Sequence, residues 1–295
     1  LLTLLAVLFL LGLVAFAFGL VTAIAGQIPQ YDPAHQRSLE VNSVIYDSTG
    51  QRVLAVLRGK ESRTILPSNR ISPLVKQAIV AIEDQRFYEH RGVDLKGIAR
   101  AVWADVRSQR VVEGGSTITQ QFVKNAIVSS QPSLTRKLKE AALAWQLEQR
   151  WSKDKILTAY LNTVYFGNGA YGVEQASKVY FHHSAQFMKP AEAALLAGIP
   201  EDPSAWDPVA HPRAAEGRRN LVLQLLYQQG YLTAHQYTTS LTYPMPKPES
   251  VSLPGTQGKF APYFANYVKD QLVQQYGPKT AFGGGLKVTT TLDKN

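Results

Sequence analysis

The sequence predicts a mostly α-helical protein in which a membrane-spanning helix and a small β-hairpin precede a helical domain. Three observations predict this arrangement. Residues 1–26 form one uncharged apolar run, residues 41–57 alternate between apolar and polar side chains, and residues 71–242 contain repeated helix-starting and helix-ending signals. Because the chain has 295 residues and 45% of them are hydrophobic, it is long and apolar enough to build a sizeable core.

The first segment, residues 1–26, is predicted to be a transmembrane anchor. A helix of this length extends about 39 Å, which exceeds the roughly 30 Å hydrocarbon core of a bilayer. A cleaved signal peptide is the alternative, because Ala23 and Ala25 fit its small-residue cleavage pattern. The apolar region of a signal peptide usually covers only about 7–15 residues, so the longer run favours an anchor.

Residues 27–70 are predicted to connect this anchor to the helical domain and to contain a β-hairpin. The polar stretch 27–39 comes first, and the alternating stretch 41–57 follows. Asp47-Ser48-Thr49-Gly50 supplies residues that favour a tight turn, so it is expected to join the two strands.

Residues 71–242 are predicted to form a chain of helices. Ser72 and Pro73 give a cap followed by proline at the first helical position, and Leu74, Ala78, Ile79 and Ile82 form an apolar stripe behind them. The further helices expected from caps, prolines and glycines cover residues 94–106, 133 or 135 to 149, 152–164, 190–198 and 212–229.

Residues 243–295 are predicted to form a linker and the start of another domain. The stretch 243–255 is rich in proline, and a short helix is expected at 263–276. Leu286, Val288, Thr290 and Leu292 then alternate as in a β-strand. A final strand with nothing to pair with suggests a second domain that has been cut off.

Charge and cysteine content narrow the classes of partner and site. The 31 basic and 22 acidic residues give a net charge of +9, which suits nucleic acid, an anionic membrane surface or a phosphorylated substrate. With no cysteine, the chain has neither disulfides nor a cysteine-based metal site.

An acidic pair, Glu83-Asp84, is expected near the end of the helix that starts at Pro73, with His90 and Gly92 in the turn after it. A carboxylate there is a candidate general base. The alternative is a solvated surface pair, although acidic residues are disfavoured near a helix C-terminus.

A Gly-Gly-hydroxyl loop, residues 114–117, precedes a segment that contains Thr119, Gln120, Gln121 and Lys124. Glycines let the backbone approach a ligand closely, and the N–H groups at a helix start attract anions, so the loop suits a pyrophosphate. An ordinary Gly-Gly turn with a Ser/Thr cap is the alternative.

The segment 136–140, RKLKE, places Arg136 and Glu140 on one helix face, with Lys137 and Lys139 beside them. It is either a surface ion pair worth about 0.3–0.5 kcal/mol or a basic cluster that grips phosphate. A third segment combines Tyr160, Asn162 and the glycine-rich stretch 165–172. Its rings and amides suit a sugar, and core packing is the alternative.

Together these segments closely resemble the peptidoglycan glycosyltransferase domain of class A penicillin-binding proteins. The resemblance covers residues 71–226, and its motifs occur in the family's order: EDQRFYEHRG, GGSTITQQFVKN, RKLKE, LNTVYFGNGAYG and EAALLAGIPEDPSAWDP with RRNLVL. The closing GGLKVTTTLD resembles the entry to the transpeptidase domain of bifunctional members, which implies an anchor, a glycosyltransferase domain and a linker truncated before that domain. Glu113 departs from the family, where many relatives carry glutamine.

The resemblance implies a lysozyme-like fold on the extracytoplasmic side of the bacterial cytoplasmic membrane, held by a single span. It implies polymerisation of lipid II into β-1,4 glycan strands with inversion and release of undecaprenyl pyrophosphate. The implied partners are lipid II, the growing strand, the membrane and other cell-wall synthesis proteins, with no nucleic acid.

The resemblance also implies roles for individual residues. Glu83 falls on the catalytic base, and Glu140 falls on a second glutamate that positions the pyrophosphate, alone or through a divalent cation such as Mg²⁺ or Mn²⁺; no organic cofactor is expected. The residues predicted to bind substrate, from the resemblance and from the residue types together, are Asp84, His90, Gly115, Ser116, Thr117, Thr119, Gln120, Gln121, Lys124, Arg136, Lys137, Asn162, Tyr165 and Gly167.

Two other classes of function compete with this one. A lysozyme-like glycan-cleaving enzyme also uses glutamates, but it needs no grip on a pyrophosphate. A membrane-anchored scaffold without chemistry predicts that Glu83 tolerates substitution by glutamine.

Overall fold

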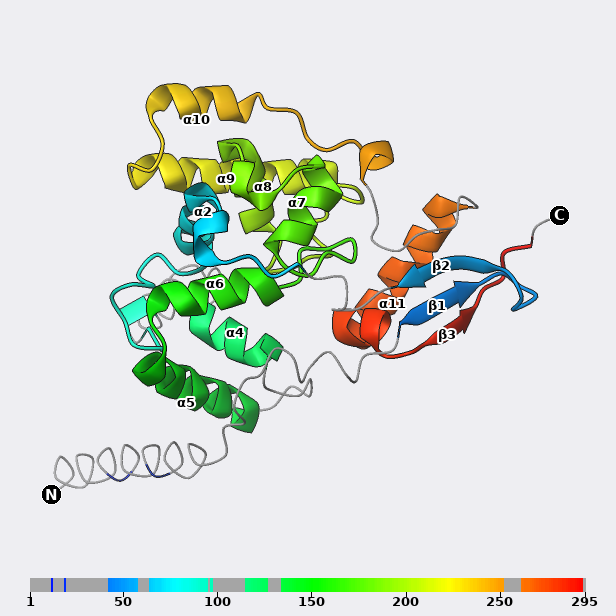
Figure 1. Cartoon of the computed structure of the whole chain (residues 1–295), viewed down its shortest axis with the longest axis horizontal. Helices are drawn as coiled ribbons and strands as arrows, with labels where there is room; N and C mark the ends of the chain where they lie inside the picture. Colours follow the sequence, from blue (N-terminus) through cyan, green and yellow to red (C-terminus); the bar gives the residue numbers. More distant parts are fainter. Residues whose placement is uncertain are drawn as a thin grey trace, which may run out of the picture. The chain divides into compact units, whose positions relative to one another are not determined.

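The protein, described by a computed structural model, divides into two compact units. The structure describes residues 12, 19, 42–57, 64–94, 96–97, 115–126, 134–251 and 261–293. The smaller unit combines Leu1–Tyr31 with Arg86–Leu157, and the larger unit combines Asp32–Gln85 with Thr158–Asn295. The described part is mostly helical with one small sheet, which confirms the predicted class at that level (Figure 1).

Helices account for most of the described elements, and α6 begins in the smaller unit and ends in the larger one. The smaller unit contains α4 (Ile118–Ala126) and α5 (Leu134–Arg150), and α6 covers Lys153–Thr163. The larger unit contains η3 (Ser68–Arg70), α2 (Pro73–Glu83), α7 (Val173–Phe181), η4 (Ala185–Phe187), α8 (Pro190–Gly198), α9 (Pro212–Gln228), α10 (Ala234–Leu241), η5 (Pro248–Ser250) and α11 (Pro262–Gly283).

Several predicted helix boundaries are confirmed to within one residue, because their sequence signals act locally. Proline occupies the first turn of α2, α8 and α9, where its missing N–H costs nothing. Gly230, at φ 77°, follows the end of α9. The cap of α2 differs in one respect: the Ser72 hydroxyl makes no capping bond, and the Ser72 carbonyl oxygen accepts from Val75 N at 3.1 Å.

The core of the larger unit is built where α2, α8 and α9 pack together. Every residue of α8 from Ala191 to Gly198 is buried, and the small residues among them allow close approach. A Cβ atom at Gly198 would lie 2.7 Å from Cγ of Arg218 on α9. On α2 the buried side chains include Val75, Ala78 and Ile79, so the apolar stripe lies slightly round the helix from the predicted one.

The sheet has the strand order β2-β1-β3 and joins segments from opposite ends of the chain. The strands β1 (Ser43–Tyr46) and β2 (Val53–Leu57) are antiparallel, which confirms the predicted hairpin. Asp47 shapes its turn, because Asp47 Oδ1 accepts from Thr49 Oγ1 at 2.7 Å and from Thr49 N at 3.2 Å. The expectation of an unpartnered final strand is wrong, since β3 (Lys287–Thr289) pairs in parallel with β1.

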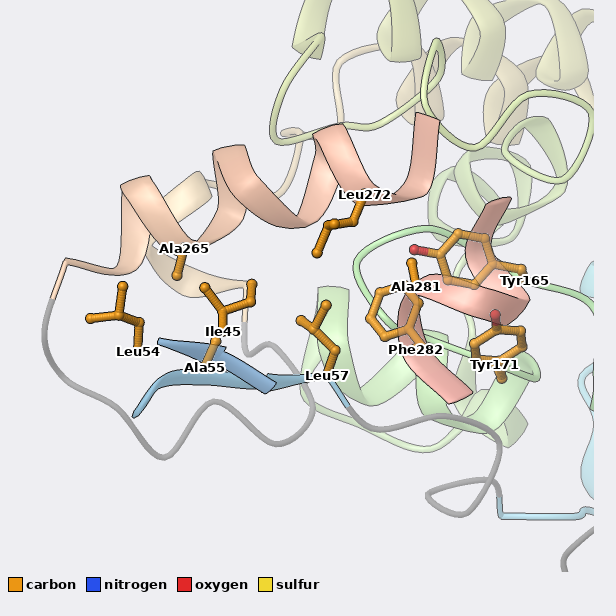
Figure 2. Close-up of a cluster of buried hydrophobic side chains, with 10 residues drawn as sticks. All are labelled: Ile45, Leu54, Ala55, Leu57, Tyr165, Tyr171, Ala265, Leu272, Ala281 and Phe282. Carbon is orange, nitrogen blue, oxygen red and sulfur yellow. The ribbon is translucent and has the colours of Figure 1, made fainter. Parts of the chain in front are cut away.

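Helix α11 covers this sheet and extends its core toward the loop after α6. The core cluster contains Ile45, Leu54 and Leu57 from the strands and Leu272 and Phe282 from α11. Figure 2 shows Phe282 beside the rings of Tyr165 and Tyr171, which come from that loop. The predicted helix at 263–276 is confirmed, and Gly277, at φ 75°, breaks α11 directly after it.

Some predictions fall outside the described residues. These are the anchor over residues 1–26 apart from Gly12 and Gly19, the polar stretch 27–39, most of the helix expected at 94–106, Glu113, Gly114 of the Gly-Gly loop, and residues 252–255 of the proline-rich linker. Among the residues that are described, none of the helices has the length and apolar character needed to span a bilayer.

Two helices of the structure, α7 and α10, are not among the helices that the sequence predicts individually. The sequence does signal the start of α10, because Thr233 is followed three residues later by Gln236, the pattern of a capping box. In the structure Gln236 N donates to Thr233 Oγ1 at 3.2 Å and Thr233 N donates to Gln236 Oε1 at 2.9 Å. In α7 the buried Glu174 fastens the helix to the next segment, accepting from Ala185 N at 2.9 Å and Ser184 Oγ at 3.0 Å. Burial raises the pKa of Glu174, but these bonds and Lys178 outweigh burial and leave the pKa below its usual value.

We expect Glu174→Ala to lower the free energy of unfolding by roughly 1–3 kcal/mol near neutral pH, because the buried Ala185 N–H loses its acceptor. The stability that Glu174 contributes is present above its ordinary pKa and is lost as pH falls through its lower folded-state pKa. Chemical unfolding at several pH values measures the difference between wild type and variant, which should shrink in acid. The exposed Glu249→Ala is the control, and equal effects of both variants would contradict this account.

Candidate active site

The hydroxyl-rich loop before α4 is folded by its own side chains. Thr117 N donates to Gln120 Oε1 at 2.9 Å, and Gln120 N donates to Thr117 Oγ1 at 3.2 Å, which forms a capping box at the helix start. The Thr117 hydroxyl also donates to the Gly92 carbonyl oxygen at 2.6 Å. Thr117 and Gln120, both predicted to bind substrate, are buried and hold the loop in place, whereas Gly115 is exposed beside them.

Gly92 is needed where this loop meets α5. Its φ of 81° is unfavourable for other residues, and an added Cβ would lie 2.5 Å from Trp145 N and 2.7 Å from Ala144 O. The sequence predicts only that Gly92 lies in a turn. The structure adds that it allows the Thr117 contact and the close approach of α5.

A charged cluster on α5 connects to the same loop. Arg136 Nε lies 3.1 Å from Glu140 Oε1, and Lys137 Nζ lies 3.3 Å from Glu140 Oε2. Lys137 Nζ also donates to Ser116 Oγ at 2.6 Å. Since the Glu140 side chain is only 1% exposed, this is not the solvated surface pair that the sequence left open. We call Ser116, Arg136, Lys137 and Glu140 the α5 charge cluster.

The α5 charge cluster has the character of an anion site. Two cations face one carboxylate, so one positive charge is in excess. The Lys137 side chain is 51% exposed, and its Nζ stands beside the N-terminal turn of α4, whose N–H groups favour negative charge. Lys124, also predicted to bind phosphate, is exposed in the last turn of α4.

Thr119 and Gln121 differ in their surroundings. Thr119 is fully buried and donates to Glu148 Oε1 at 2.5 Å, and Lys153 Nζ lies 2.8 Å from Glu148 Oε2. Lys153 Nζ also lies 4.4 Å from the centre of the Phe87 ring. The Thr119 hydroxyl therefore fixes α4 to the last turns of α5, a link that nothing in the sequence signalled. Gln121 is half-buried.

The described residues do not fit a resident divalent cation at Glu140. Mg²⁺ and Mn²⁺ prefer several oxygen ligands, and nowhere in the described ranges do three or more His, Asp or Glu side chains gather to hold a metal. Both Glu140 oxygens already face cationic nitrogens. A divalent cation at Glu140 therefore stays a prediction from the resemblance alone.

Glu83, the predicted base, ends α2 in the larger unit. It is half-buried with its Oε1 atom out of contact with solvent, and the buried Asp84 after it is the C-cap of α2. Tyr160 on α6 is fully buried in the same unit. Its pKa is raised well above the usual value, first by burial and then by the negative charge of Glu83, so the phenol stays neutral beside the carboxylate.

The glycine-rich segment after α6 directs its polar groups inward. Asn162 accepts from Leu66 N and donates to Leu66 O, each at 2.9 Å, so its amide fastens α6 to the connector before α2. Tyr165 packs against Tyr171 with ring centres 4.8 Å apart, and its hydroxyl accepts from Gly169 N at 3.3 Å. A Cβ at Gly167 would lie 3.0 Å from the Tyr180 hydroxyl. For Asn162 and Tyr165 the geometry indicates a supporting role, and sugar contact stays a prediction.

His90 lies in the smaller unit, and it is half-buried with its ring centre 6.3 Å from that of Phe87. In the same turn Arg86 Nε donates to Asp94 Oδ2 at 3.1 Å, and Asp94 Oδ1 accepts from Gly97 N at 2.9 Å. Asp94 therefore caps the following segment, as predicted. Glu83 and Asp84 belong to the larger unit, and His90 and the α5 charge cluster to the smaller one.

Comparison with known proteins gives consistent matches. A family model described as transglycosylase matches residues 50–227. Penicillin-binding protein 1A of Aquifex aeolicus is 39% identical over 85% of this chain and 34% of its own length. Penicillin-binding protein 1A/1B of Bacillus subtilis is 37% identical over 97% of this chain and 31% of its own length. The chain thus spans about a third of the length of the curated relatives it matches.

A crystal structure of penicillin-binding protein 1A from Haemophilus influenzae is also similar to the chain, over 84% of this chain and 26% of that one. The identity is 20% and the TM-score 0.42.

We expect Gly92→Ala to destabilise the protein by roughly 1–3 kcal/mol, because its Cβ would collide with the backbone of α5. Denaturant unfolding measures the change. Gly217→Ala in α9 is the matched control: it meets no atom within 4 Å and should stabilise by about 0.4–1 kcal/mol. Equal stability of Gly92→Ala and wild type would contradict the close approach described above.

Proposed function

The chain belongs to the transglycosylase family, and we propose that it is a peptidoglycan glycosyltransferase that uses lipid II as its donor and polymerises it with inversion. The family drawn from the sequence motifs is thereby confirmed. The single observation that most supports a lipid-pyrophosphate donor is the α5 charge cluster, in which Lys137 joins the hydroxyl loop to the buried Glu140.

The acceptor hydroxyl is activated by Glu83. Its carboxylate takes the proton as the 4-hydroxyl of the acceptor sugar attacks the anomeric carbon of the donor. The bond from that carbon to the pyrophosphate oxygen breaks in the same displacement, so an α-linked donor gives a β-1,4 product. Half-burial of Glu83 beside the neutral Tyr160 supports this role, because a carboxylate shielded from water is less solvated, and so more able to accept a proton, than one on an open surface.

The leaving pyrophosphate is received by cations. The pyrophosphate needs charge neutralisation more than protonation. Arg136, Lys137 and Lys124 supply the positive charge, and the Ser116 hydroxyl supplies a hydrogen bond. Glu140 acts on the leaving group through Arg136 and Lys137, whose side chains it holds in fixed positions. Gly115 and the N-terminal turn of α4 add backbone donors.

The enzyme acts at the outer face of the bacterial cytoplasmic membrane, where a lipid-linked donor remains in the bilayer. The apolar run of residues 1–26 supports a single membrane span. Such an anchor keeps the site at the depth of its substrate and lowers the entropic cost of binding. Other proteins of cell-wall synthesis are the expected partners.

We expect Glu83→Gln to abolish glycan synthesis from purified lipid II in detergent, because glutamine cannot accept the proton. The exposed Glu89→Gln is the control and should retain wild-type polymer yield. Circular dichroism checks that both variants are folded.

Wild-type polymer yield from a folded Glu83→Gln variant would contradict the assignment of Glu83 as the base, whereas neither polymer nor glycan cleavage from folded wild type would favour a scaffold without chemistry. Failure of wild type to polymerise, with cleavage of preformed glycan instead, would contradict the donor and favour a glycan-cleaving enzyme.

A further inference from the structure

A buried lysine on α11 lies against the glycine-rich loop. Lys269 is 3% exposed, and its Nζ donates to Asn168 Oδ1 at 2.8 Å and lies 3.1 Å from Asp270 Oδ1. An ammonium removed from water is costly unless it is paired and hydrogen-bonded. The hydrogen bond from Lys269 therefore connects α11 to Asn168 in the glycine-rich loop.

Asn168 is held from two sides. Its Nδ2 donates to Asp207 Oδ1 at 2.9 Å and to the Tyr180 hydroxyl at 3.0 Å, while its Oδ1 accepts from Lys269. The residue is 3% exposed and has a φ of 47°, a conformation that costs energy outside glycine. These bonds offset that strain, and the contact from Lys269 is the one that comes from α11.

A second contact from α11 reaches both ends of the same loop. The Phe282 ring centre lies 5.6 Å from that of Tyr165 and 6.0 Å from that of Tyr171 (Figure 2). Tyr165 and Tyr171 pair across the base of the loop, and Lys269 holds its tip at Asn168. Helix α11 thus supports the loop at its base and at its tip.

The space beside the Lys269 contact is polar and not filled by side chains. A cavity of about 40 Å³ is lined by Gly167, Asn168, Asp207, His211, Asp270 and Gln274, among others. A volume of this size accommodates one or two waters. Water in this cavity can replace the Lys269 ammonium as the hydrogen-bond donor to Asn168 Oδ1. The loop can therefore shift into this space once the Lys269 side chain is substituted.

We propose that Lys269 is a positioning residue that sets the conformation of the 166–170 loop through Asn168, so that glycosyl transfer depends on α11 being docked. The same segment connects to α6, whose Asn162 is fastened to the connector before α2 and so toward Glu83. The catalytic consequence rests on the proposed function, whereas the contact itself can be tested without it.

Hydrogen exchange on the full-length chain tests the contact. Lys269→Met should speed exchange at the Phe166, Gly169 and Ala170 amides at least 10-fold and leave the α4 and α5 amides unchanged. Lys287→Met, an exposed lysine on β3, is the matched control. Unchanged exchange in the loop overturns the proposal. If Lys269→Met does not fold, Asn168→Gly, which removes the acceptor of the Lys269 ammonium, is read by the same criterion.

A double-mutant cycle separates action through Asn168 from general destabilisation. Asn168→Gly keeps the backbone conformation and removes the amide, so adding Lys269→Met to it should change loop exchange by less than 2-fold. If the fold-changes of the two substitutions on the loop exchange rates multiply, Lys269 does not act through Asn168 and the proposal is overturned. In lipid II polymerisation, Lys269→Met should raise KM several-fold more than it lowers kcat. Absence of polymer from wild type counts against the proposed function alone, because the exchange results still decide the contact.

Discussion

A carboxylate removed from water must be paired, and at Glu140 this requirement organises the smaller unit. The side chain is 1% exposed, so leaving it without cations would cost several kcal/mol. Arg136 and Lys137 meet the requirement from the same helix, and Lys137 then extends to Ser116. A buried acid thereby fixes two cations, of which Lys137 lies beside the start of α4. The contacts of Glu140 with Arg136 and Lys137 serve less to stabilise the fold than to hold positive charge in place for an anion.

The larger unit uses the same principle with neutral groups. Asn162 and Asn168 each satisfy both ends of an amide, one on the backbone of Leu66 and the other on Lys269, Asp207 and Tyr180. Polar residues near a predicted sugar site therefore serve largely to position loops. Buried amides suit this task because each misplaced partner leaves an unsatisfied group, which makes one loop conformation strongly preferred.

Sequence reasoning succeeded where structure is set by local chemistry. Proline in the first turn located α8 and α9, Gly198 located the end of α8 and Gly230 the end of α9, and Asp47 with Gly50 located the hairpin turn. It failed for contacts between distant segments. The parallel pairing of β3 with β1 and the bond from Lys269 to Asn168 leave no periodic trace. Motif order identified the family and brought Ser116, Arg136, Lys137 and Glu140 together, but it could not tell that Thr117 and Gln120 would be used by the helix cap.

In the proposed mechanism, Glu140 holds Lys137 in place to receive the leaving pyrophosphate. The most direct measurement compares the rate of lipid II polymerisation by Lys137→Met and Lys139→Met, two neighbouring exposed lysines on α5 of which Lys137 contacts Glu140 and Ser116. This role of Lys137 predicts a loss of roughly 100-fold for Lys137→Met, the magnitude typical of removing one preorganised charge-stabilising donor, and near wild-type rates for Lys139→Met. Equal rates for the two folded variants would contradict it.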